Sequence, residues 1–198
     1  FHFAMTMTTP IIFDAEIKHG VITDHNPAQT GYRYAKGWHD FEGMGIACIG
    51  AFDTLDTRTR VFMDDNFSAF ADLIRAGRMV VSFNGHQFDD KLLAANGIHI
   101  PHSQSLDLAA MIWRAAGIPQ GEHPRGLCLQ AICEANNIPG KTGNGADAPQ
   151  DYQDGRIGRV IDYCLGDVRS TTHLWRYLQM AGGVRDPRNG EWLNVAVP

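Results

Sequence analysis

Cysteine and lysine are both scarce in this 198-residue sequence, which has four of each. Four cysteines with no C-x-x-C pair are too few for a disulfide-stapled scaffold. Cys128 and Cys133 are five residues apart, a spacing that would put them on different faces of a helix and therefore disfavours a zinc site. We expect Cys48, Cys128, Cys133 and Cys164 to be buried free thiols.

Long apolar runs are also missing. No stretch approaches the ~20 apolar residues that span a bilayer, and no charged start followed by an apolar block marks a secretion signal. A hydrophobic share of 44% is nevertheless enough to bury a core, which excludes a disordered chain. We therefore expect a soluble, cytoplasmic protein that has no membrane partner.

Basic residues are also fewer than acidic ones, 17 against 22, which gives a net charge of −5. Such a chain is not an obvious nucleic-acid binder, since phosphate contacts need positive charge. The same balance would arise, however, if several carboxylates hold divalent cations. The P-loop pattern G-x-x-x-x-G-K-[ST] is absent, and no G-x-G-x-x-G follows a strand, so other phosphate-binding folds find no support.

Strand-like and helical stretches alternate along the chain, which predicts an α/β fold built on one sheet. We expect residues 1–10 to be a disordered tail or an expression remnant, 11–182 to form one domain, and 183–198 to be a C-terminal extension of that domain. Apolar runs predict strands at 11–13, 45–52, 59–63 and 79–83, the middle two forming a hairpin, and helical spacing predicts helices at 67–76, 86–95, 106–116, 127–136 and 157–180.

Acidic residues at three separate places carry the strongest chemical signal. Asp14 and Glu16 end the first apolar run, and residues i and i+2 of a strand point to the same face. Asp89 opens a predicted helix, and Asp167 shares a helix face with Tyr163 at i and i+4. Each signal alone has an ordinary explanation: a solvated strand end, an acid at a helix N-terminus, or an amphipathic helix.

In chain order, these residues resemble the three motifs of the DEDD superfamily of 3′–5′ exonucleases. The motif D-x-E is matched by Asp14 and Glu16, N-x-x-x-F-D by residues 84–89, and Y-x-x-x-D by Tyr163 and Asp167. The histidine subclass has a His where this chain has Asp162, so the resemblance is to the tyrosine (DEDDy) subclass.

Within that subclass, the sequence is most similar to the proofreading exonuclease domain of family B DNA polymerases, which shares the pattern Y-C-x-x-D found at residues 163–167. The stretch 127–143, including Ile138-Pro-Gly-Lys-Thr-Gly143, also looks like stand-alone exonucleases related to that domain. The resemblance covers about residues 11–180 and leaves no room for a polymerase, so we expect a free-standing exonuclease.

The resemblance implies a ribonuclease-H-like fold, with a mixed central sheet of about five strands flanked by helices. It also implies two divalent cations, Mg²⁺ or Mn²⁺, held by Asp14, Glu16, Asp89 and Asp167. In this scheme Asp14 bridges both ions, Glu16 and Asp167 hold the ion on the nucleophile side, and Asp89 acts on the other ion, partly through water. Tyr163 would complete the catalytic set by orienting the attacking water, since a phenol with a pKa of ~10 is a poor general base.

Three further residues are expected to bind substrate. Asn84 and Phe88 belong to the second motif, although a turn-forming Asn and a core Phe explain them equally well. Ile17 stands where Thr often follows the first-motif Glu, so a hydroxyl contact to the terminal nucleotide is missing there. The polar stretch 18–45 mixes basic and aromatic residues, which suits single-strand binding but also an ordinary solvated loop.

These observations predict an enzyme that hydrolyses phosphodiester bonds at single-stranded or frayed DNA 3′ ends and releases nucleoside 5′-monophosphates. The partner is then a DNA 3′ end; the oligomeric state stays open. The same chemistry on RNA is an alternative, because the motifs do not read a 2′-hydroxyl. A nucleic-acid-binding module with a degenerate site is another, and the presence of all four acids weighs against it. His86 and Asp107 are near the motifs but are assigned no catalytic role.

Overall fold

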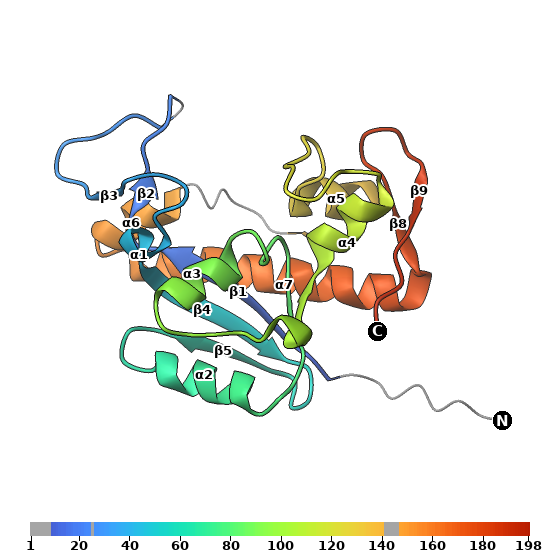
Figure 1. Cartoon of the computed structure of the whole chain (residues 1–198), viewed down its shortest axis with the longest axis horizontal. Helices are drawn as coiled ribbons and strands as arrows, with labels where there is room; N and C mark the ends of the chain where they lie inside the picture. Colours follow the sequence, from blue (N-terminus) through green and yellow to red (C-terminus); the bar gives the residue numbers. More distant parts are fainter. Residues whose placement is uncertain (1–8, 25, 141–146) are drawn as a thin grey trace.

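The computed structural model describes residues 9–24, 26–140 and 147–198. Its centre is a five-stranded sheet with strand order β5-β4-β1-β6-β7 (Figure 1). Strand β1 is antiparallel to β4 and parallel to β6, so the sheet is mixed. The strands are β1 (Ile11–Ile17), β4 (Ile46–Asp53), β5 (Arg58–Phe62), β6 (Val80–Ser82) and β7 (Ser105–Asp107).

Helices flank this sheet, and the longest, α7, packs against β1 and β4 (Figure 1). Two small two-stranded sheets, β2–β3 and β8–β9, lie outside the central one. The helices are α1 (Phe41–Met44), α2 (Phe67–Arg75), α3 (Asp89–Ala95), α4 (Leu108–Ala115), α5 (Leu129–Ala135), α6 (Ala148–Gln153) and α7 (Ile157–Ala181). A 3₁₀ turn spans His102–Gln104, and the short strands are β2 (Gly20–Val21), β3 (Tyr34–Ala35), β8 (Gly183–Arg185) and β9 (Trp192–Asn194).

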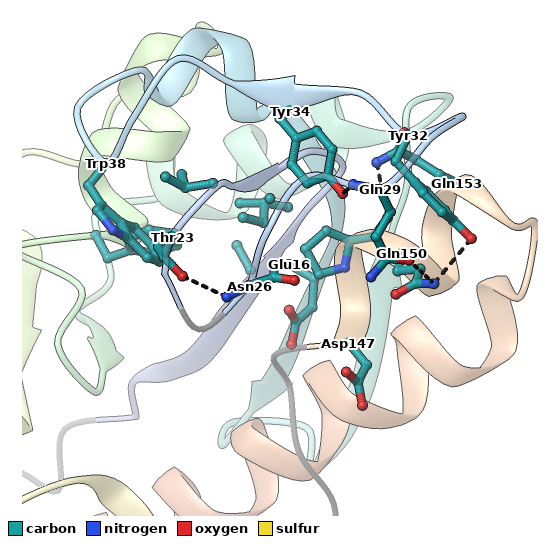
Figure 2. Close-up of a pocket in the computed structure, with 16 residues that line it drawn as sticks. Glu16, Thr23, Asn26, Gln29, Tyr32, Tyr34, Trp38, Asp147, Gln150 and Gln153 are labelled. Atoms are coloured by element: carbon teal, nitrogen blue, oxygen red, sulfur yellow. Dashed lines mark hydrogen bonds between the residues drawn. The ribbon is translucent and has the colours of Figure 1, made fainter.

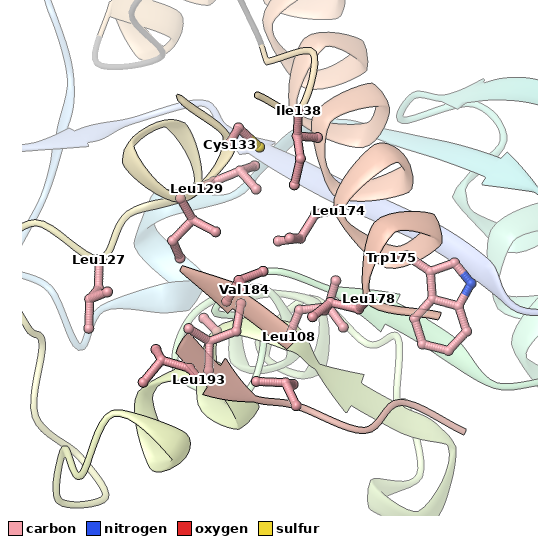
Figure 3. Close-up of a cluster of buried hydrophobic side chains, with 14 of the residues drawn as sticks. Leu108, Leu127, Leu129, Cys133, Ile138, Leu174, Trp175, Leu178, Val184 and Leu193 are labelled. Carbon is pink, nitrogen blue, oxygen red and sulfur yellow. The ribbon is translucent and has the colours of Figure 1, made fainter. Parts of the chain in front are cut away.

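The sheet is buried on both faces, and neighbouring residues of β1 belong to different cores. Ile12 joins the cluster formed with α4, α5, α7 and the β8–β9 pair (Figure 3). Ile11 and Phe13 join the opposite cluster, formed with α2 and α3. Because side chains alternate along a strand, a strand covered on both faces reads as one continuous apolar run, which is how β1 begins.

The expected mixed sheet is confirmed, but the sequence pattern indicates only four of its strands and assigns the fifth to a helix. The sequence pattern assigns 106–116 to one helix, whereas the first part of this stretch forms edge strand β7 and α4 begins at Leu108. A three-residue strand is too short to show an alternating pattern, and Asp107 ends it as the N-cap of α4 by accepting a hydrogen bond from the Ala110 N–H. Similarly, α3 begins at Asp89, and residues 86–88 form a turn.

The stretch 18–45 is partly ordered in its described part, where β2 pairs with β3 and is followed by α1. It is attached to α6: the Tyr32 hydroxyl donates to Asp154 at 2.9 Å, and the Arg33 N–H donates to Gln153 at 2.7 Å. Cys128 is exposed, which corrects the expectation of four buried thiols. It precedes α5 as its N-cap, so its side chain does not reach the core.

Some expectations concern residues outside the described ranges. These are residues 1–8 of the predicted tail and residues 141–143 of the 138–143 stretch. Pro10 is buried, and its carbonyl accepts hydrogen bonds from the N–H and hydroxyl of Thr54. At the other end, Val184, Leu193 and Val195 contribute to the core. No helix in the described part of the chain combines the length and apolar character needed to cross a membrane.

Candidate active site

Strand β1 and helix α7 bring three carboxylates together. Asp14 and Glu16 project from the second half of β1, and Asp167 projects from α7. One oxygen from each lies within 4.8 Å of the other two, and all three residues are half-buried. Like charges this close disfavour one another's ionised form unless a cation or proton is shared. The arrangement is therefore one that a divalent cation would stabilise.

The close approach of α7 to the sheet depends on Gly50 of β4, which pairs in register with Asp14. A Cβ at this position would lie 2.9 Å from Cys164 Sγ and 3.2 Å from a methyl of Val168. In the space that the glycine leaves, its N–H donates to Cys164 Sγ at 3.1 Å. The Cys164 thiol in turn donates to the Asp14 carbonyl at 3.3 Å. This contact joins α7 to both strands three residues before Asp167.

Asp89, the fourth acid, lies next to this group but is not one of its three members. It is the first residue of α3 and is only 5% exposed. One of its oxygens accepts a hydrogen bond from the Ala15 N–H at 3.2 Å, between the two acids of β1 in sequence. Burial, with the charge of Asp90 in second place, raises the pKa of Asp89 to about 7. A cation beside it would favour the ionised form.

The turn that carries Asn84 is held by Asp107. Asn84 has a left-handed backbone with φ of +68°, and its N–H donates to Asp107 at 2.8 Å. The His86 N–H donates to the second oxygen of Asp107 at 3.1 Å. Asp107, which is buried and also caps α4, therefore fixes the turn of the second motif. Its position just before an apolar helix is the sequence signal for this structural role.

Tyr163 is half-buried on α7, one turn before Asp167. Among the described residues, no hydrogen-bond partner is found for its phenol. The phenol thus lies on the same helix face as the third carboxylate and keeps its hydrogen-bonding capacity for another molecule. This placement agrees with the i and i+4 spacing seen in the sequence.

A cavity of about 450 Å³ lies beside Glu16, and Ile17 and Phe88 help to line it (Figure 2). Its other walls come from the 18–45 stretch and α6. The amide of Gln150 donates to the Tyr32 hydroxyl at 3.1 Å across these two walls. A second cavity of about 390 Å³ is lined by Asp14, Asp167 and Asn84. The predicted metal-binding and substrate-binding residues other than Asp89 thus each line one of these two cavities.

The mixed five-stranded sheet with its flanking helices is a ribonuclease-H-like fold. The chain is similar to the structure of the family B DNA polymerase from the hyperthermophilic archaeon Pyrobaculum calidifontis, with a TM-score of 0.59 and 16% sequence identity. The match covers 86% of this chain and 24% of the polymerase, so the chain spans about a quarter of that protein's length. At this identity the likeness concerns the fold.

A family similarity is found in the C-terminal half. Residues 118–193 match the family described as "Predicted 3'-5' exonuclease related to the exonuclease domain of PolB". This stretch contains Tyr163 and Asp167, whereas Asp14, Glu16 and Asp89 lie before it. No curated protein matches the chain in sequence. The chain is thus similar to a family of predicted 3′–5′ exonucleases over residues 118–193, and to a family B DNA polymerase in fold.

Proposed function

We propose that this protein is a metal-dependent 3′–5′ exonuclease of the DEDDy type, which shortens single-stranded or frayed DNA 3′ ends and releases nucleoside 5′-monophosphates. The observation that carries this proposal is the convergence of Asp14, Glu16 and Asp167, which are up to 153 residues apart in sequence, to within 4.8 Å. A chance cluster of acids would not also border cavities lined by the second-motif residues Asn84 and Phe88.

The donor set fits hard divalent cations. Carboxylate oxygens are the ligands that Mg²⁺ and Mn²⁺ prefer, and no thiol belongs to the group. Asp14, Glu16 and Asp167 would hold one ion, and Asp14 with the adjacent Asp89 a second. When bound, the two ions would stabilise the negative charge that develops on the attacking and leaving oxygens of phosphodiester hydrolysis.

Tyr163 would orient the attacking water. Its phenol lies one turn from Asp167 and makes no hydrogen bond within residues 9–24, 26–140 and 147–198. We expect Tyr163→Phe to lower kcat at least about tenfold, less than the ~10²–10⁴-fold contribution of a group that transfers a proton, with little change in Mn²⁺ affinity. Unchanged turnover in steady-state assays would remove Tyr163 from the mechanism.

The cavity beside Glu16 would hold the terminal nucleotide. Its volume of about 450 Å³ lies within the range of small-ligand sites, and Phe88 and Ile17 offer apolar contact to a base. Trp38 also lines it and is 57% exposed, a position from which an indole stacks on a base without sequence preference. Trp38→Ala should therefore raise the KM for DNA, with kcat affected less.

DNA is favoured over RNA because both comparisons point to polymerases that act on DNA. The proposal is tested with 5′-labelled single-stranded DNA, duplex DNA and RNA, each incubated with Mg²⁺, Mn²⁺ or EDTA. Wild type is compared with Glu16→Gln and with Glu191→Gln, which makes the same change at an exposed carboxylate outside the site.

We expect a ladder that shortens from the 3′ end of DNA, only with metal, in wild type and Glu191→Gln. Shortening of RNA in preference to DNA would instead make the protein an exoribonuclease. No shortening of any substrate, with binding retained, would overturn the enzymatic proposal and leave a nucleic-acid-binding module.

A further inference from the structure

A groove leads away from the acidic group on the side of Asn84 and Phe88. A cavity of about 520 Å³ lined by Trp38, Asn84, Phe88 and Lys91 continues from the two cavities of the site. It is followed by one of about 660 Å³, with which it shares Lys91, and which is bordered by residues of α4. We call these two cavities together the α3–α4 groove.

The groove is cationic, in a chain whose net charge is −5. Lys91 of α3 and Arg114 of α4 both line it and are exposed. Neither forms a salt bridge with any described residue, whereas Lys18, Arg60 and Arg78 each have a carboxylate partner. The two cations are thus available to an anionic ligand.

The acid in the groove wall does not cancel this charge. Asp107 is buried and accepts hydrogen bonds from three backbone N–H groups, those of residues 84, 86 and 110. The imidazoles of His86 and His102, whose ring centres are 5.2 Å apart, line the same cavity. Both Asp107 oxygens are thus occupied by backbone N–H groups, while Lys91 and Arg114 carry the exposed charges of the groove.

Aromatic side chains are found where the groove meets the site, and cations further along it. Trp38 and Phe88 belong both to the cavity beside Glu16 and to the first part of the groove. Lys91 and Arg114 follow. Stacking surfaces combined with a positively charged groove are the features that bind single-stranded nucleic acid without sequence preference.

Resting on the proposed exonuclease function, we propose that the α3–α4 groove binds the strand upstream of the 3′-terminal nucleotide, with Lys91 and Arg114 contacting its phosphates. The ligand is a phosphodiester backbone several nucleotides long. A dinucleotide has a single phosphodiester, the one to be cleaved, and so lacks the upstream phosphates that Lys91 and Arg114 would contact.

The test compares Lys91→Ala/Arg114→Ala with wild type on a DNA dinucleotide and on a 12-nucleotide strand. The control is Arg58→Ala/Arg185→Ala, which removes the same charge from two exposed arginines on β5 and β8. Circular dichroism and thermal unfolding establish that each variant folds, and the single changes Lys91→Gln and Arg114→Gln replace the double variant if it does not.

We expect the groove variant to raise the KM for the 12-mer at least about tenfold in 50 mM salt, with the KM for the dinucleotide changed far less. Binding of a labelled 12-mer in EDTA should also lose salt dependence, the slope of log K against log salt falling by about 1.4 for two lost single-strand phosphate contacts. The control should change neither quantity in this way.

Equal effects of the groove variant on both substrates, or equal effects of groove and control variants, would overturn the proposal. If wild type hydrolyses neither substrate, the proposed function itself fails. If wild type hydrolyses both and the groove variant behaves like wild type, only the groove assignment fails.

Discussion

Two buried aspartates lie at opposite ends of β1, and their surroundings shift their pKa values in opposite directions. Asp53, in register with Ile11 at the start of the strand, is bound on both oxygens by Arg78, at 2.8 and 2.6 Å. These bonds lower the pKa of Asp53. Asp89, near the other end, accepts a bond from Ala15, but burial and a neighbouring carboxylate raise its pKa to about 7.

This difference separates acids that stabilise the fold from acids of the candidate active site. Where the protein supplies its own cations, as around Asp53, an acid stabilises the fold. Where acids gather, as Asp14, Glu16 and Asp167 do, their like charges oppose one another, and a bound cation would make them compatible. Buried carboxylates should therefore fall into two groups, one needed for stability and the other for activity.

The largest expected effect comes from Asp14→Asn. We expect kcat/KM to fall about a thousandfold or more, because a metal-held carboxylate supports several kcal/mol of transition-state stabilisation. The free energy of unfolding of the metal-free protein should change far less than the activity, because the like charges of Asp14, Glu16 and Asp167 oppose one another. Exonuclease assays and urea unfolding measure the two quantities, and an Asp14→Asn protein that is active would place the chemistry elsewhere.

Asp53→Asn should have the opposite effects: a loss of stability, with activity retained. Removing this charge leaves Arg78 without its buried partner, which should cost about 3 kcal/mol in the free energy of unfolding. Activity per folded molecule should stay near the wild-type value. Loss of activity at a temperature where the variant is fully folded would contradict the separation of the two groups.

Gly50→Ala should lower both stability and activity, because this glycine determines how closely α7 approaches the acids of β1. The added Cβ would meet Cys164 Sγ at 2.9 Å and should cost about 1–3 kcal/mol of stability through overpacking. A displaced α7 also moves Asp167, so activity should fall as well. Gly158→Ala is the matched control, because its Cβ would meet nothing within 4 Å and alanine favours a helix interior.

The two aspartates should also give opposite pH dependences of stability, measured by urea unfolding in EDTA. The folded-state pKa of Asp89 is raised above its unfolded value of ~3.9, so the native state binds more protons and stability falls as pH rises from about 4 to 7. Asp53 has a lowered pKa, so its contribution is present above pH ~4 and is lost as pH falls below it.

Single substitutions test which residue causes each pH dependence of the stability. Asp89→Asn should flatten the fall between pH 4 and 7, and Asp53→Asn should flatten the loss at acidic pH. A wild-type stability that rises steadily across pH 4 to 7, with no change in Asp89→Asn, would mean that Asp89 is ionised without a metal.

Local geometry explains why so much of the candidate site could be expected from the sequence. The pairing of Asp14 with Glu16 follows from the two-residue period of a strand, and that of Tyr163 with Asp167 from the helical turn. Asn84 and Phe88 of the N-x-x-x-F-D motif also line the cavities beside these acids. The catalytic roles of these residues stay predictions that the experiments above address.

The sequence by itself determined the α/β class, the hairpin, the long C-terminal helix and the local pairing of acids, because each depends on residues a few positions apart. Only the tertiary structure decided that edge strand β7 completes the sheet, that Gly50 admits Cys164, and that Lys91 and Arg114 face one groove. These features join segments far apart in the chain, and packing in three dimensions, which leaves no periodic trace in the sequence, brings them together.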